Sequence, residues 1–278
     1  MTDAELRAWI DSQPQTLGNS WIDQLDERKR AEAEFHDEFR ADHKNEQKTA
    51  PNQRFYEAAT IVSDYIDSWI ENAGARTGTF LDYACGDGTY TIQAARAGAN
   101  LAVGIDISET SVRNAGETAA AAGLQTRTRF LQRDCEDTGF PSGAFSTALC
   151  SGMLHHLELS RAFPELSRIM APGGRILCVE ALHYNPVIQY YRNRTPELRT
   201  DWEKAHILGL TEVNYAKQWF NVENMKFFLM AAPLATFFPR GVVRSGLLQV
   251  GHAIDAVATR IPLLQLWSWQ FAFELVKA

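Results

Sequence analysis

The sequence has little of what would direct it to a membrane, to secretion or to nucleic acids. Its longest apolar run covers residues 227–238, contains Pro233 and is shorter than the roughly 20 residues that span a bilayer. No basic segment followed by an apolar one stands at the start, so we expect no secretory signal. Lys and Arg number 27 against 34 Asp and Glu, a net charge of −7. Without a basic surface we expect no nucleic-acid partner.

Cysteine is also scarce. The four cysteines contain no Cys-x-x-Cys pair and lie within or beside apolar runs, so their spacing favours neither a zinc site nor a disulfide framework. Reduced thiols and the missing signal together predict a cytoplasmic protein. The 278 residues are 45% apolar and 22% charged, which allows a substantial core in one large domain or two small ones.

The first fifty residues differ from the rest of the chain. Charged residues dominate between Trp21 and Lys48, which is typical of a helical arm that cannot bury a core of its own. Its basic cluster, residues 28–30, lies among acidic residues, and we interpret it as a solvated helix face. We expect residues 1–52 to form this arm and residues 53–278 the main domain. That domain begins with an amphipathic helix over 55–69, with Gly74 as its C-cap.

From residue 79 onward, short apolar runs alternate with helical stretches. The runs are 80–84, 101–105, 128–131, 145–150 and 175–179, and the helical stretches between them include 89–96, 108–122 and 161–170. This alternation predicts βαβ units, hence a mostly parallel sheet with helices on both faces. Because ligands of such sheets bind at the carboxyl ends of the strands, chemistry is expected directly after each run.

Acidic and glycine-rich segments follow these runs. Asp82 stands at the end of the first one, and Gly86 and Gly88 after it let the backbone approach a ligand and open the next helix. Asp106 ends the second run, where a carboxylate either accepts hydrogen bonds from ribose hydroxyls or caps the following helix. Asp134 closes the third run, where it either holds an amino group of a base or lies in a solvated turn.

In this order, the segments LDYACGDGTY, VGIDIS, RDCED, ALCSGMLHHL and APGGRILCVE resemble the successive motifs of the class I S-adenosylmethionine-dependent methyltransferases. The resemblance covers about residues 78–182. It implies a Rossmann-like seven-stranded sheet in the order 3-2-1-4-5-7-6, with S-adenosylmethionine as cofactor. By position, the cofactor-binding residues that it implies are Asp82, Ala84, Gly86, Asp106, Ile107, Asp134, Cys135, Ser151 and His156.

Two positions qualify the resemblance. Ala84 replaces the first glycine of the family's loop, which is tolerable if its φ is negative. Thr91 occupies the place of the third glycine that a nicotinamide-dependent oxidoreductase would need, which disfavours that alternative. A methyltransferase-fold protein that binds a ligand without catalysis is the other alternative.

The resemblance extends loosely to bacterial small-molecule, natural-product type methyltransferases, so we expect a small organic acceptor in a biosynthetic reaction. O-methylation by in-line displacement is the first expectation, with N- or C-methylation as the alternative. A general base would assist an alcohol or phenol, and the candidates are His155 and His206, with His36 on the arm as a lesser one. His155 and His156 should diverge, so that only one reaches the acceptor. No metal-ligand spacing is evident, and we expect no metal.

The last hundred residues depart from the alternating pattern. The aromatic- and arginine-rich region 183–210 predicts acceptor contacts through Tyr184, Tyr191 and Arg194. A strand is expected over 212–219 and another over 267–276. Between them, residues 220–266 are expected to form a helical insertion that packs as a cap or makes a homodimer surface, because it is too apolar to stay exposed.

Overall fold

The computed structural model describes residues 1–41, 55, 57–72, 78–195 and 200–278. In this part of the chain, seven strands form one sheet in the order β3-β2-β1-β4-β5-β7-β6, the order that the resemblance implies. Strands β1 to β5 are parallel to one another, and β7 runs antiparallel to both β5 and β6. The strands are β1 (Thr79–Tyr83), β2 (Leu101–Asp106), β3 (Thr128–Gln132), β4 (Phe145–Ser151), β5 (Met170–Ala181), β6 (Phe220–Phe228) and β7 (Gln270–Lys277).

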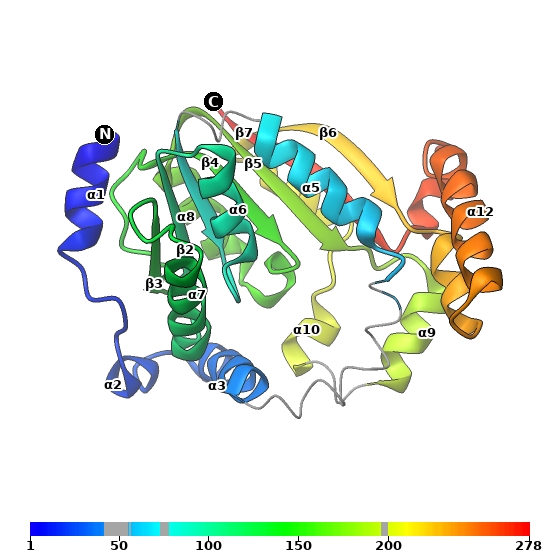
Figure 1. Ribbon diagram of the computed structural model, residues 1–278, viewed down its shortest axis with the longest axis horizontal. Helices are drawn as coiled ribbons and strands as arrows, with labels where there is room; N and C mark the ends of the chain where they lie inside the picture. The colour runs from blue at the N-terminus through cyan, green and yellow to red at the C-terminus, as the bar shows by residue number, and fades with distance from the viewer. Residues whose placement is uncertain (42–54, 56, 73–77, 196–199) are drawn as a thin grey trace.

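Helices cover both faces of the sheet (Figure 1). Within the described residues they are α1 (Asp3–Asp11), α2 (Asn19–Ile22), α3 (Glu27–Ala41), α5 (Thr60–Asn72), α6 (Thr89–Ala97), α7 (Glu109–Ala121), α8 (Leu159–Ile169), α9 (Pro186–Arg194), α10 (Asp201–Ala205), α11 (Leu210–Ala216) and α12 (Val242–Ala258). The 3₁₀ turns are η1 (Leu154–His156), η3 (Ala232–Phe237) and η4 (Leu264–Trp267). None of these helices combines the length and the apolarity that a membrane crossing requires.

The sheet separates two apolar layers, which explains why its strands are hydrophobic without alternation. Phe80 and Leu81 are neighbours in β1 and point to opposite faces. Phe80 packs with Ile66 of α5 and other side chains of one layer, whereas Leu81 packs with Phe163 of α8 in the other. Side chains pack so closely against β2 that a Cβ on Gly104 would stand 2.8 Å from atoms of Cys85, of Thr91 in α6 and of Phe130 in β3.

The N-terminal arm is partly integrated into the core. Leu6 and Ile10 of α1 are fully buried in the same apolar layer as α8. Arg7 donates hydrogen bonds to backbone carbonyls of Asn100 and Thr126. The start of the chain therefore buries apolar surface against the main domain.

The C-terminal region corrects two expectations. Residues 212–219 contain no strand: Leu210–Ala216 is helix α11, which begins where Glu212 accepts a hydrogen bond from the Gly209 N–H. The first part of the expected helical insertion is instead strand β6. Its pairing with β7 shifts between Glu223 and Lys226, and Asn224 has a φ of 50°. This irregularity breaks the period of two that would have revealed the strand.

The second part of the insertion is helical, as expected, and forms η3 and α12. Asp255 of α12 accepts hydrogen bonds from the backbone N–H groups of Ala231 and Ala232, which fastens α12 to η3. The outer side of α12 exposes apolar residues, including Val243 and Val257. The homodimer expected from this segment stays a prediction.

Three other helices and strands begin a few residues away from the positions expected from the sequence. The helix expected from residue 55 is α5 and begins at Thr60, and its expected cap, Gly74, lies outside the described residues. Strand β5 begins at Met170, directly after α8, so the Pro-Gly-Gly segment belongs to the irregular start of the strand. Strand β7 begins at Gln270.

Candidate cofactor and acceptor site

The loops after β1 and β2 are joined by hydrogen bonds at the carboxyl edge of the sheet. The Gly86 N–H donates to Oδ2 of Asp106 at 2.9 Å, and the Ser108 N–H donates to Oδ1 at the same distance. Asp106 is therefore buried between two loops, while Ser108 is the N-cap of α7. Ile107, next to Asp106, is partly exposed, and its carbonyl accepts a hydrogen bond from the Gln132 side chain.

Ala84 does not have the negative φ that would make an alanine easy to accommodate in this loop. Its φ is +63°, in the left-handed region, as is the φ of +53° at Gly86. A β-carbon in this region costs about 1–2 kcal/mol relative to glycine, because it approaches the following carbonyl oxygen. The chain keeps the loop conformation in spite of this strain, since the loop is held on both sides by β1 and by Asp106.

Asp82 lies at the end of β1 and is fully buried beneath this loop. Its Oδ2 accepts hydrogen bonds from the Thr91 N–H at 2.9 Å and from the Thr91 hydroxyl at 2.8 Å. Burial raises the pKa of Asp82 to about 7, although the two bonds from Thr91 oppose the rise. Thr91 therefore holds the Asp82 carboxyl, and it does so at the position where a nicotinamide-dependent oxidoreductase would need a glycine.

Asp134 and Glu136 form a buried ionic cluster with the arm. Lys29 of α3 donates to Asp134 at 2.7 Å and lies 2.8 Å from a Glu136 oxygen, and Arg28 lies 2.5 Å from the other Glu136 oxygen. The basic cluster is thus not the solvated face expected from the sequence, because Arg28 and Lys29 neutralise carboxylates that the sheet buries. The neighbouring Cys135 carbonyl accepts a hydrogen bond from the Tyr83 hydroxyl.

Helix α3 crosses the ends of several strands (Figure 1). Beyond the contacts with the loop after β3, Arg28 donates to the carbonyl of His156 after β4 at 2.7 Å. Asp37, further along α3, accepts from the Ser108 hydroxyl at 2.5 Å and from the Thr110 N–H at 3.0 Å. The arm therefore covers the loops after β2, β3 and β4, the edge at which the resemblance places the cofactor.

The two histidines after β4 do not diverge as expected. Their ring centroids are 4.3 Å apart, but each ring has its own carboxylate partner. Nδ1 of His155 lies 2.6 Å from Glu180, and Nδ1 of His156 lies 3.0 Å from Glu32. Burial would lower the pKa of His156, but the Glu32 carboxylate outweighs it and raises that pKa above its ordinary value.

Glu180 organises the loop that carries His155. It is almost fully buried at the end of β5, and its Oε1 accepts hydrogen bonds from the N–H groups of Met153 and Leu154. Its Oε2 holds His155. Because a carboxylate only accepts, Nδ1 of His155 carries a proton in this contact. Nε2 of His155 is 3.9 Å from an oxygen of Glu203 in α10.

The remaining predicted residues lie in more varied surroundings. His206 is exposed and stacks on Trp202, with ring centroids 3.7 Å apart. Ser151 ends β4 and is partly exposed. Tyr184 is partly buried, and its hydroxyl accepts from the Leu210 N–H at 3.0 Å. Tyr191 packs edge-on against Phe55.

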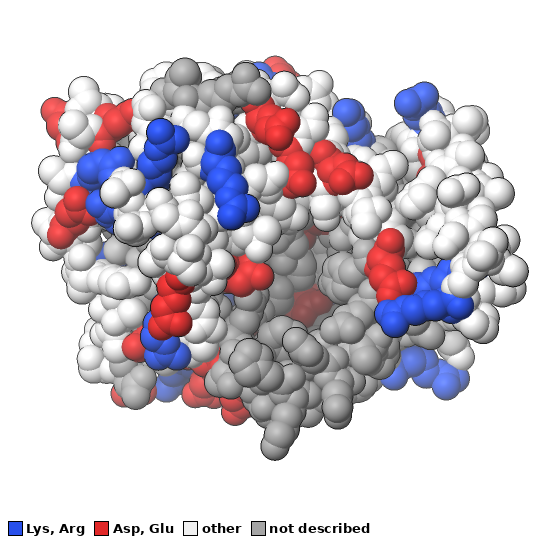
Figure 2. Space-filling model, in the orientation of Figure 1, with Lys and Arg blue, Asp and Glu red and all other residues white. Residues whose placement is uncertain are grey.

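Arg194 lies on the exposed side of α9, where its guanidinium stacks over the ring of Tyr190. The arginine that α9 buries is Arg192, which donates to the carbonyl of Leu182. In Figure 2 the surface is hollowed between the side that carries α7 and the side that carries α12, with acidic side chains visible inside.

Sequence reasoning missed Lys29, Glu32 and Glu180 as members of this site. Glu180 directly follows an apolar run, as Asp106 and Asp134 do, so the same strand-end rule could have found it. Lys29 and Glu32 had no such signal, since their partners lie more than a hundred residues away.

Comparison with known proteins shows which family part of this chain resembles. Residues 80–174 match the model of a methyltransferase domain. The chain is 30% identical over 122 residues to 27-O-demethylrifamycin SV methyltransferase of Amycolatopsis mediterranei. This match covers 43% of this chain and 44% of that protein. It is also 33% identical over 117 residues to demethylmenaquinone methyltransferase of Thermus thermophilus, a match that covers 41% of this chain and 51% of that protein.

The chain thus spans about half the length of these curated relatives. Among solved structures, the fold is similar to magnesium protoporphyrin IX methyltransferase of Synechocystis PCC 6803 with a TM-score of 0.58 and 14% identity. The match covers 91% of this chain and 100% of that one. The ordered motifs, the strand order and these likenesses agree: residues 80–174 are similar to a methyltransferase domain, and the sheet has the strand order implied by the resemblance to the class I S-adenosylmethionine-dependent methyltransferases.

Proposed function

We propose that the protein transfers a methyl group from S-adenosylmethionine to a small organic acceptor in a biosynthetic reaction, with an oxygen as the receiving atom. One observation carries the proposal. The carboxylates of Asp82, Asp106 and Asp134 lie at or just beyond the ends of the neighbouring strands β1, β2 and β3, beside a glycine loop at the carboxyl edge of the sheet. A cofactor with a cationic amino acid part, a ribose and an adenine offers a partner to each of them.

The hydrogen-bond capacity of these carboxylates supports the assignment. An ionised carboxylate has about four lone-pair sites. Asp106 uses two of them for the N–H groups of Gly86 and Ser108, which leaves two for a pair of ribose hydroxyls. Asp134 accepts from Lys29 and from the Glu136 N–H, and keeps capacity for an exocyclic amino group.

The arrangement of His155 supports an oxygen acceptor. When bound, S-adenosylmethionine supplies a methyl group on a positively charged sulfur. Glu180 holds a proton of His155 on Nδ1, so in the neutral imidazole Nε2 is directed away from Glu180 with its lone pair available. As the new oxygen–methyl bond forms and the sulfur–methyl bond breaks, Nε2 takes the hydroxyl proton of the acceptor. Proton removal by a positioned base contributes about 10²–10⁴-fold to rate.

The acceptor class is inferred from the segment that follows β5. This segment carries aromatic side chains, with Tyr184 just before α9, Tyr191 on α9 and Trp202 on α10. Such walls suit an aromatic or polycyclic alcohol. The name of the Amycolatopsis relative places the missing methyl group of its own substrate on an oxygen.

Cofactor binding is tested first, by calorimetry of S-adenosylmethionine with the wild type, Asp106→Ala and the control Glu117→Gln. Glu117 is an exposed acid on α7. Loss of two charge-assisted hydrogen bonds, each worth about 1.5–3 kcal/mol, predicts an affinity at least about 100-fold lower for Asp106→Ala. Wild-type affinity in that variant, or no binding by the wild type, would contradict the proposal.

Methyl transfer is tested next with a panel of phenols, alcohols and amines, by mass spectrometry of the methylated product. We expect phenols or alcohols to be methylated. His155→Gln should lower kcat by about 10²–10⁴-fold with unchanged cofactor affinity, since its side chain keeps polarity but loses the basic nitrogen. Cofactor binding without methylation of any acceptor would favour a binding protein, and methylation of amines alone would favour an N-methyltransferase.

A further inference from the structure

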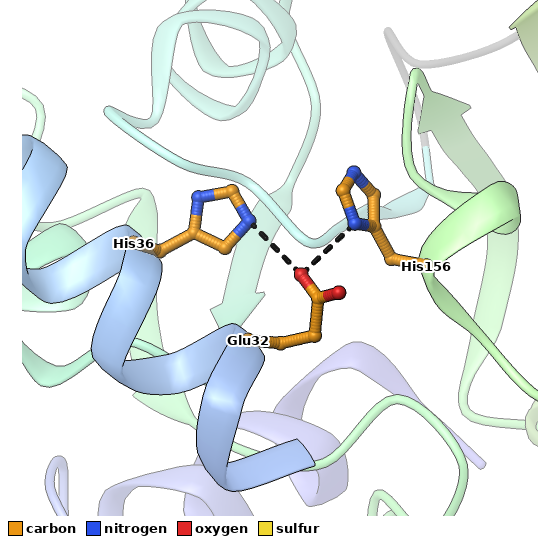
Figure 3. Close-up of side chains that lie close together, drawn as sticks. All are labelled: Glu32, His36 and His156. Atoms are coloured by element: carbon orange, nitrogen blue, oxygen red, sulfur yellow. Dashed lines mark hydrogen bonds and ion pairs between the residues drawn. The ribbon is translucent and has the colours of Figure 1, made fainter. Parts of the chain in front are cut away.

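Three potential metal ligands from two distant segments converge beside the arm (Figure 3). Glu32 and His36 lie one turn apart on α3, so their side chains share a face of the helix. His156, in η1, faces them from the loop after β4. Oε2 of Glu32 is 3.0 Å from Nδ1 of His156 and 3.7 Å from Nε2 of His36. One ligand atom from each residue lies within 4.8 Å of the other two.

We propose that Glu32, His36 and His156 bind one divalent transition-metal ion, with zinc as the representative case. Two imidazoles and a carboxylate are the donor set of many zinc and iron(II) sites. Ligand atoms about 2.1 Å from a metal stand about 3.0–3.4 Å apart at octahedral or tetrahedral angles. The distance of 3.0 Å from Glu32 to His156 lies within this range, and the distance of 3.7 Å from Glu32 to His36 is a few tenths of an ångström longer.

The surroundings orient the carboxylate toward the two imidazoles. Oε1 of Glu32 accepts a hydrogen bond from the Thr200 hydroxyl at 2.6 Å, so Oε2 is the oxygen that faces the histidines. Supporting bonds of this kind are typical of metal ligands, because they fix the ligand before the ion arrives. Glu32 is buried, whereas the His36 side chain is 32% exposed, which gives an ion a route into the site.

The donor atoms also define which ions fit. Magnesium and calcium prefer oxygen ligands, whereas imidazole nitrogen selects zinc, iron, cobalt or nickel. A second group, made of His155, His156 and Glu203, shares one histidine with the first. There, however, the distance from His155 to Glu203 is 3.9 Å, which is longer than either distance from Glu32 in the first group. The geometry therefore favours the group on α3.

A bound ion would join the arm to the loop after β4 by coordination, in addition to the hydrogen bond from Arg28 to the His156 carbonyl. No metal is predicted from the sequence pattern, because ligand spacing reveals a site only when the ligands are close in sequence. Here His36 and His156 are separated by 120 positions. The proposal concerns metal binding alone and does not depend on the reaction that the protein catalyses.

The test is a calorimetric titration of the full chain with Zn²⁺ after treatment with a chelator. We expect one equivalent to bind and a large excess of Mg²⁺ not to compete. Loss of a supporting residue alone typically costs about 10–100-fold in metal affinity, so His36→Ala and Glu32→Gln should each weaken binding by about 100-fold or more. His252→Ala is the control, because this histidine lies on α12 at the other end of the molecule.

Hydrogen exchange provides a second readout. Zn²⁺ should slow exchange over residues 27–41 in the wild type and in His252→Ala, and leave His36→Ala unchanged, because the ion clamps α3. Circular dichroism establishes that each variant is folded. The proposal is wrong if the wild type does not bind Zn²⁺, or if His36→Ala binds it as the wild type does. It is also wrong if Glu203→Gln abolishes binding while His36→Ala preserves it, since the ion then occupies the second group.

Discussion

The buried carboxyl of Asp82 makes a specific prediction about how stability depends on pH. In the folded chain its pKa is about 7, against an ordinary value of 3.8, because burial penalises the charge. Between these values the folded state holds a proton that the unfolded chain has released. The stability that this carboxyl contributes is therefore lost progressively as pH rises from about 4 to about 7, and does not return above it.

The magnitude follows from the shift. At about 1.36 kcal/mol per pKa unit, Asp82 should make the wild type about 2–3 kcal/mol less stable at pH of about 8 than at pH of about 5. Asp82→Asn retains the size of the side chain and an oxygen for the bonds from Thr91, but cannot ionise. Other acids, such as Glu165 with its lowered pKa, affect both proteins equally. The difference in stability between wild type and variant therefore isolates Asp82.

Urea unfolding of both proteins across this pH range measures that difference. It should shift by about 2–3 kcal/mol in favour of the variant as pH rises. A difference that stays constant with pH would refute the reasoning, because it would mean that Asp82 ionises normally in the folded chain. If the proposed function is right, the cationic cofactor also favours ionised Asp82. Binding of S-adenosylmethionine should then release a proton near neutral pH, and calorimetry in buffers of different ionisation enthalpy detects it.

Three further substitutions test the packing around the site. Ala84→Gly removes a β-carbon from a residue at φ +63° and should stabilise the protein by up to about 1 kcal/mol in thermal unfolding; a destabilised variant would show that the loop is not strained. Gly104→Ala places a β-carbon 2.8 Å from atoms of Cys85, Thr91 and Phe130 and should cost about 1–3 kcal/mol in urea unfolding, whereas a neutral result would contradict the close packing of these side chains against β2. Lys29→Met leaves Asp134 and Glu136 with less compensation and should cost about 3 kcal/mol or more. Lys29→Arg should cost less, and equal losses in the two variants would argue against a role for the charge.

Much of the fold was predictable because it depends on local patterns. The runs at 80–84 and 101–105 are apolar without interruption, which is typical of strands buried on both faces, and they became β1 and β2. The acids Asp82, Asp106 and Asp134 stand where such strands end. Only strand β6 lacked a regular pattern, since it is an edge strand with an irregular pairing around Asn224.

The tertiary structure decided the partners of these acids and the conformation of the loops. Whether Ala84 adopts a positive φ depends on the strand and the carboxylate that hold its loop, not on its own preference. Whether Lys29 is solvated or buried depends on where α3 docks, which is more than a hundred residues away in sequence from Asp134. The sequence by itself therefore determined the alternation of strands and helices and the acids at the strand ends, whereas the order of the strands was implied by the family resemblance. Only folding determined that α3 covers this edge and brings Glu32 and His36 to His156, because contacts between distant segments leave no periodic trace in the chain.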